Sequence, residues 1–122
     1  MLILTFKLPK TDLKYISNAI HYSIGEMLGN DDLNYLDFYN LQSLSRKFYF
    51  AGYYDMDQIL KKGQTTKVKI NVNEIESFFK LINCHSLGIW ADPYSATIIQ
   101  QLRAIFDARI WDIKNIKFHH EF

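Results

Sequence analysis

Cys84 is followed directly by His85, and a thiol beside an imidazole is a pair that nucleophilic enzymes use. The apolar spacing predicts a helix here, and adjacent helical side chains diverge by about 100°, so these two cannot face each other. The alternative that a distant histidine approaches the Cys84 thiol stays open. Because Cys84 is the single cysteine, a disulfide framework within the chain is excluded. We expect a small, buried or half-buried thiol.

Asp55 and Asp57 form an Asp-x-Asp pair of the kind that can hold Mg²⁺, and the competing role is to cap the turn that follows. A small metal-dependent enzyme or toxin that uses these two carboxylates is therefore kept as an alternative. The four histidines show no His-x-x-x-His spacing, and no nucleophile elbow, P-loop or dinucleotide motif occurs. We accordingly expect a protein that is not an enzyme, with no catalytic residues, no metal and no cofactor.

Lysines cluster in and after a predicted loop, at positions Lys61, Lys62, Lys67 and Lys69. They could contact the phosphates of RNA or single-stranded DNA, or form the solvated outer face of an edge strand. The formal net charge of the whole chain is only +1, which argues against a nucleic-acid binder that works by bulk electrostatics. An RNA or single-stranded nucleic-acid-binding module is the second hypothesis.

Aromatic residues gather in a predicted helix over 31–52, where they repeat every three, four or seven positions. One broad arc of this helix makes an aliphatic core face: Leu33, Leu36, Leu41, Leu44, Phe48 and Ala51. The opposite side carries a second stripe: Tyr35, Phe38, Tyr39, Gln42, Arg46, Tyr49, Phe50 and Tyr53.

Two interpretations of the aromatic stripe remain open. A helix that is apolar on all sides is either buried all round or offers a binding surface. The stripe combines Tyr, Phe and Arg, which are enriched at protein–protein hot spots. Acidic residues outnumber basic ones in 31–57, which disfavours nucleic acid and favours a protein partner, either a host protein or a second copy.

The sequence also predicts the strands and helices that position these candidate residues. Alternating apolar residues predict strands over 2–8, 68–72 and 116–122, the last with Ile116, Phe118, His120 and Phe122 on one face. Helical spacing predicts four helices: one after Thr11 or Asp12 that ends at Gly29, one over 31–52 capped by Asn30, one opened by an Asn73–Glu76 capping box, and one opened by Asp92-Pro93. The prediction is a single α+β domain over 1–122, a two-layer fold in the order βααβααβ. About three strands form an antiparallel or mixed sheet that the helices cover.

Composition bounds the function class. The chain has 122 residues, 48% of them hydrophobic and 16% aromatic, which is enough for one domain with a real core. It contains no apolar run long enough to span a membrane and no signal peptide, so we expect a cytoplasmic protein without membrane association. Its abundance of Ile, Lys, Phe, Tyr and Asn indicates an A/T-rich gene.

Together these features predict a small non-catalytic binding protein that uses the aromatic helix to grip another protein. The small size, the A/T-rich gene and the missing catalytic motifs are typical of phage or mobile-element proteins that regulate or inhibit a larger host protein or complex. Anti-defence proteins, including those of the anti-CRISPR type, are one such case.

Overall fold

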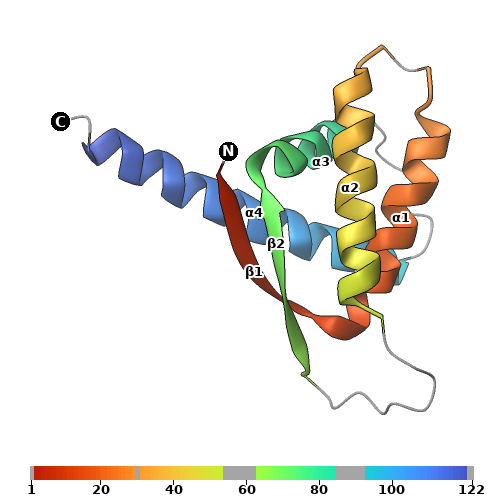
Figure 1. Ribbon diagram of the computed structural model, residues 1–122, viewed down its shortest axis with the longest axis horizontal. Helices are drawn as coiled ribbons and strands as arrows, with labels where there is room; N and C mark the ends of the chain where they lie inside the picture. The colour runs from red at the N-terminus through yellow and green to blue at the C-terminus, as the bar shows by residue number, and fades with distance from the viewer. Residues whose placement is uncertain (1, 30, 54–62, 85–92, 121–122) are drawn as a thin grey trace.

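The computed structural model describes residues 2–29, 31–53, 63–84 and 93–120, and in the last segment the side chains only as far as 115. Along the chain it contains β1 (Ile3–Pro9), a 3₁₀ turn (Lys10–Asp12), α1 (Leu13–Glu26), α2 (Tyr35–Ala51), β2 (Thr65–Asn71), α3 (Val72–Cys84) and α4 (Pro93–His120) (Figure 1). The α+β class is confirmed, with four helices and a two-stranded antiparallel sheet in the described part of the chain.

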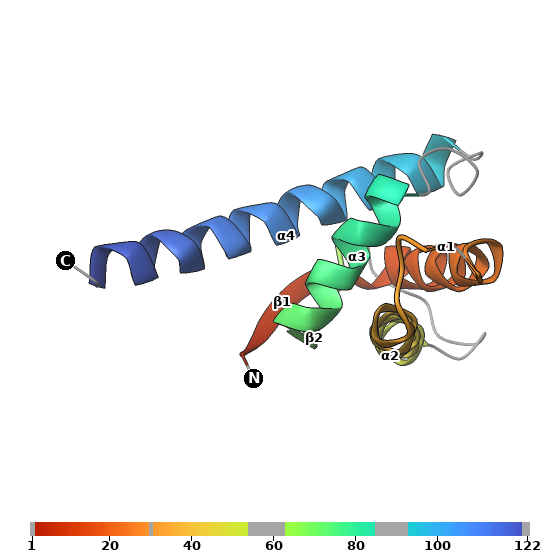
Figure 2. The same cartoon turned by 90° about the horizontal axis from the view of Figure 1, so that it is seen from above.

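The two strands pair along their whole length, from Ile3 opposite Asn71 to Pro9 opposite Thr65. Alternate residues of β1 and β2 are buried, as expected for strands with one apolar face. That inner face packs on α4, where the rings of Phe6 and Phe106 meet edge to face at 5.1 Å. Seen from above, α4 lies on one side of the sheet and α2 on the other side of the molecule (Figure 2).

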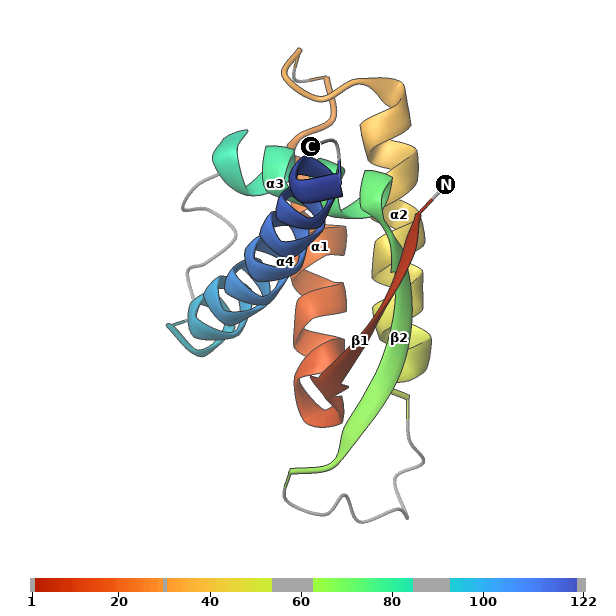
Figure 3. The ribbon, with the colours of Figure 1, turned by 90° about the vertical axis from the view of Figure 1, so that its left-hand side faces the viewer.

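Helices α1 and α2 form an antiparallel pair beside the sheet (Figures 1 and 3). Two small residues let them approach closely. The Ser17 hydroxyl donates to the backbone carbonyl of Ser45 at 2.8 Å, and the Ser45 hydroxyl donates to the carbonyl of Ser17 at 3.1 Å. Because both serines are buried, this reciprocal pair satisfies polar groups that burial would otherwise penalise. It also fixes which side of α2 faces α1.

The predicted terminal strand is wrong, and so is the order βααβααβ. Helix α4 continues to His120, through the residues whose alternation suggested a strand, and Phe122 lies outside the described residues. The physical reason is that the helical spacing of Ile99, Leu102 and Phe106 continues through Ile110 and Ile113, and no Gly or Pro after Pro93 stops the helix. An alternation of seven residues is too short to outweigh an established helical period.

The helix starts also differ from their predicted positions. Asn34 caps α2, whereas Asn30 was the predicted cap and lies outside the described residues. At α3 the box uses Asn71 and Glu74 in place of Asn73 and Glu76: the Asn71 side chain accepts from the Glu74 N–H at 2.8 Å, and the Glu74 carboxylate accepts from the Asn71 N–H at 3.0 Å. The box falls two residues earlier because β2 passes directly into α3.

None of the helices in the described part of the chain combines the length and the hydropathy that a membrane crossing requires.

Candidate functional site

Helix α2 is held in place at its N-terminal end by polar contacts. The side chain of Asn34 accepts from the Asp37 N–H at 2.8 Å, and the Asp37 carboxylate accepts from the Asn34 N–H at 3.1 Å. Asp37 also accepts from the Ser77 hydroxyl at 2.9 Å and pairs with Lys80 at 3.2 Å, both on α3. The first turn of α2 is therefore joined to α3.

Two further contacts position the rest of α2. In its fourth turn, Lys47 pairs with the fully buried Glu74 of α3 at 2.5 Å. At the C-terminal end, Gly52 lies so close to α1 that a Cβ on it would come within 2.8 Å of the Leu13 Cβ. The inner face, with Leu41, Leu44 and Phe48, is fully buried. Helix α2 is thus a fixed support, and its remaining side faces outward.

The outward side of α2 carries large apolar side chains that the core does not cover. Tyr35 is 89% exposed, Tyr39 65% and Phe50 71%, and Tyr49 and Tyr53 are also exposed. Gln42 and Arg46 are exposed between them. Phe38 differs from the other residues of the predicted stripe because it is half-buried and packs against the core. The interpretation in which this helix is buried all round is wrong.

Leu36 was predicted to belong to the core face, and that prediction is wrong, because it is 61% exposed. Successive helical residues rotate by about 100°, which places Leu36 some 140° from Leu41 and near Phe50 on the outward side. Leu36, Ser43 and Phe50 are spaced by seven residues, a signal that was present in the sequence. We define the α2 face as the outward set Tyr35, Leu36, Tyr39, Gln42, Ser43, Arg46, Tyr49, Phe50 and Tyr53.

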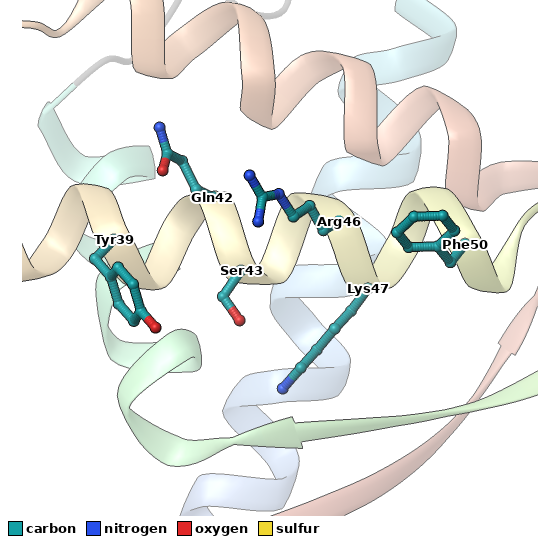
Figure 4. A pocket seen from close by; sticks show the side chains of 6 residues that line it. All are labelled: Tyr39, Gln42, Ser43, Arg46, Lys47 and Phe50. Carbon is teal, nitrogen blue, oxygen red and sulfur yellow. The ribbon is translucent and has the colours of Figure 1, made fainter.

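The middle of the α2 face is hollow and carries polar groups between aromatic rings. A depression of about 380 Å³ lies between Tyr39 and Phe50 and is also lined by Gln42, Ser43, Arg46 and Lys47. Figure 4 shows Lys47 directed toward β2, while Arg46 lies on the other side of the helix axis. The Lys47 ammonium group pairs with Glu74 in the first turn of α3. Among the described residues, no carboxylate lies within ion-pair distance of Arg46. The centre of the face therefore presents a guanidinium group to an incoming partner.

The two ends of the α2 face differ in the charged residues that lie beside their apolar side chains. Asp31 and Asp32 are exposed just before its N-terminal end. At the other end the Lys14 ammonium group lies 5.7 Å from the centre of the Tyr53 ring, and the rings of Tyr49 and Phe50 meet edge to face at 5.6 Å. The face thus has an acidic end, a cationic centre and a basic, aromatic end.

The structure describes two of the four lysines that were predicted as a nucleic-acid-binding group. Lys67 and Lys69 point outward from β2, whereas Lys61 and Lys62 lie outside the described residues. Sequence reasoning missed Lys7, which lies directly opposite Lys67 in the strand register. Three lysines thus share the outer face of the sheet. All side chains that alternate onto this face along β1 and β2 are non-aromatic, so the described part of the face offers no ring for base stacking.

The candidate catalytic groups are not brought together in the described residues. Asp55, Asp57 and His85 lie outside them. Cys84 is half-buried at the end of α3, and burial, together with the nearby carboxylates of Asp32 and Asp37, raises the pKa of its thiol. A raised pKa lowers the thiolate fraction at neutral pH, which is the reverse of an activated nucleophile. The described parts of the chain hold no group of three or more His, Cys, Asp and Glu side chains placed to bind a metal ion.

Comparisons with protein families, curated proteins and solved structures find no match to this chain.

Proposed function

We propose that this chain is a small non-catalytic binding protein whose α2 face grips another protein. The observation that carries the proposal is the exposure of six large apolar side chains on one side of a single, well-supported helix. With the ordinary area of such side chains, they present roughly 700 Å² of surface. Gln42, Ser43 and Arg46 divide this area between the two ends of the face, and each half is comparable with the largest apolar patches of monomeric proteins, which are often functional.

The chemistry of the α2 face favours a protein over a small molecule. Tyr and Arg dominate binding energy at protein interfaces because they combine large rigid area with a hydrogen-bonding group. The Arg46 guanidinium group lines the central hollow, which suits an acidic or carbonyl-bearing side chain of a partner (Figure 4). In keeping with the small size and the A/T-rich gene, we propose that the chain regulates or inhibits a larger host protein as part of a phage or mobile element.

The experiment compares capture of cellular proteins by two variants with the same number of lost aromatic rings. Tyr39→Ala combined with Tyr49→Ala removes one exposed ring from each half of the α2 face. Trp111→Ala combined with Tyr22→Ala removes two exposed rings, on α4 and α1, outside the α2 face. We expect the first pair to lose the partner that the wild type captures and the second pair to retain it, with both folded by circular dichroism. Retention of every partner by the first pair would show that the proposal is wrong.

A second candidate function is supported by the lysines on the outer face of the sheet. Lys7 and Lys67 lie directly opposite each other, and like charges in that register repel unless an anion lies between them. A polyanion such as RNA would supply that charge. Binding of a single-stranded oligonucleotide that weakens as salt rises, and that Lys67→Gln with Lys69→Gln reduces, would support this candidate. Absence of binding at low salt would exclude it.

A further inference from the structure

The side chains of the α2 face follow a seven-residue repeat in three parallel columns. The first column holds Tyr35, Gln42 and Tyr49, the second Tyr39, Arg46 and Tyr53, and the third Leu36, Ser43 and Phe50. The first two columns alternate at spacings of four and three, which is the a/d pattern by which one helix packs along another. Tyr53 follows the end of α2, where its N–H donates to the Phe50 carbonyl at 3.3 Å and continues the turn.

Each column reads apolar, polar, apolar, so the face has the same chemistry in both directions from its midpoint. A face of this kind is complementary to itself when two copies meet antiparallel about a twofold axis. In that arrangement Tyr35 meets the partner's Tyr53, Tyr39 meets the partner's Tyr49, and Arg46 meets the partner's Gln42. In the third column, Leu36 of one copy lies beside the partner's Phe50, and the two Ser43 residues lie next to the axis.

We propose that the occupant of the α2 face is a second copy of this chain, packed with its α2 antiparallel to the first. The inference rests on the proposed function, since it names the partner of the same protein-binding face. The Gln42 side-chain carbonyl is an acceptor for the Arg46 guanidinium of the other copy, which supplies the partner that the described residues do not give Arg46. A larger host protein would have to compete with this second copy.

Charge favours the antiparallel orientation over the parallel one. An antiparallel pair brings Asp31 and Asp32 of one copy to the end where the other copy carries Lys14 beside Tyr53. A parallel pair would place the acidic ends together and would put the two Arg46 side chains in the same layer. Antiparallel helix dipoles also attract each other, because each N-terminus lies beside a C-terminus.

The size and position of the α2 face meet what a stable dimer needs. With roughly 700 Å² on each copy, complete coverage of the apolar side chains would bury roughly 1,400 Å², which lies within the range of standard specific interfaces. Helix α2 forms an outer layer of the molecule, and neither the sheet nor α4 lies on its outward side (Figure 2). Two copies can therefore meet along the length from Tyr35 to Tyr53, about 27 Å at the helical rise per residue.

Sedimentation equilibrium of the purified wild-type chain, at concentrations from about 1 to 200 μM, tests whether the dimer forms. We expect a reversible monomer–dimer equilibrium. Tyr39→Ala with Tyr49→Ala should raise the dimer dissociation constant at least a hundredfold, because each substitution occurs twice in the interface. Trp111→Ala with Tyr22→Ala should leave it within a factor of two. A wild type that stays monomeric throughout, or a dimer that the first pair does not weaken, would overturn the proposal.

Disulfide trapping tests the orientation in a Cys84→Ser background. Two chains, one with Tyr35→Cys and one with Tyr53→Cys, are mixed under a mild oxidant. We expect cross-linked dimers that contain one chain of each kind, and no cross-link in either chain alone. A cross-link between two Tyr35→Cys chains would show a parallel pair and contradict the inference.

The outcomes separate this inference from the proposed function. If the wild type is monomeric and Tyr39→Ala with Tyr49→Ala still abolishes capture of a cellular protein, the second copy is excluded while the protein-binding function stands. If substitutions in the α2 face weaken the dimer but do not change the capture of any cellular protein, the dimer is supported and a host partner at this face is excluded.

Discussion

At the scale of the residue, Asp37 joins two helices through one carboxylate. It accepts hydrogen bonds from the Asn34 N–H, the Ser77 hydroxyl and the Lys80 ammonium group. Burial by itself raises the pKa of this carboxyl, but those three donors outweigh burial and lower the pKa below its ordinary value. Because the folded protein favours the ionised form, Asp37 contributes stability above the unfolded pKa, near 4, and this contribution is lost as pH falls through the lower folded pKa.

Asp37→Asn is therefore expected to reduce the free energy of unfolding at pH 7 by about 1–3 kcal/mol, the cost of losing charge-assisted hydrogen bonds at a buried position. As pH falls below the unfolded pKa, near 4, the wild type and the variant should approach each other in stability, since protonation of the wild-type carboxyl removes its charge. Urea denaturation at pH 7 and at pH 2.5 measures both differences. An equal difference at the two pH values would contradict the assignment of this stability to the charged carboxylate.

At the scale of the element, the display of the α2 face depends on how closely α2 packs against α1. The pairing of Ser17 with Ser45 brings the helices together along their middle. Gly52 continues the approach at the end of α2, with a φ of −89° that any residue can adopt. Glycine is favoured at position 52 because α1 leaves no space for a side chain, and the backbone conformation there does not itself require glycine.

Two Gly→Ala substitutions should consequently act in opposite directions. Gly52→Ala places a Cβ 2.8 Å from the Leu13 Cβ and should destabilise the fold by about 1–3 kcal/mol through overpacking. Gly25 lies in α1 on the exposed side with no atom within 4 Å of an added Cβ, so Gly25→Ala should stabilise by about 0.5–1 kcal/mol through helix propensity. Urea denaturation compares the two variants with the wild type. A stabilising Gly52→Ala would contradict the close approach of α2 to α1.

The elements also show which parts of the fold the sequence can predict. The two strands and the cores of four helices were predicted from apolar spacing, because burial of one face is a local requirement. The prediction placed Val72 at the end of the second strand, whereas it is the first residue of α3. The start of α3 was not, since two overlapping Asn-x-x-Glu boxes, at Asn71 and Asn73, are equally good locally and only the pairing of β2 with β1 selects the first. The end of α4 was missed for a similar reason: a short alternation cannot show which of two periods the chain follows.

At the scale of the whole molecule, the described aromatic side chains lie in the core, on the α2 face and at four exposed positions elsewhere: Tyr15, Tyr22, Tyr94 and Trp111. In the core, Phe6, Phe78 and Phe106 form an edge-to-face cluster between the sheet, α3 and α4, and Phe48 is buried on the inner side of α2. The rings of the α2 face are additional to this core. Their spacing in the sequence located the candidate site, but spacing alone could not show exposure, which depends on α1 and α3 covering only the inner side of α2.

The most direct test of the central claim, that the α2 face is a protein-binding surface, is hydroxyl-radical footprinting of its four tyrosines. Tyr35, Tyr39, Tyr49 and Tyr53 are compared with Tyr22, an exposed ring on α1, in dilute protein, in concentrated protein and in the complex with any captured partner. The account predicts that all five tyrosines react in dilute protein, and that the four on the α2 face become protected together on association while Tyr22 stays reactive. Unreactive α2-face tyrosines in dilute protein, or full reactivity of all four in every associated state, would contradict it.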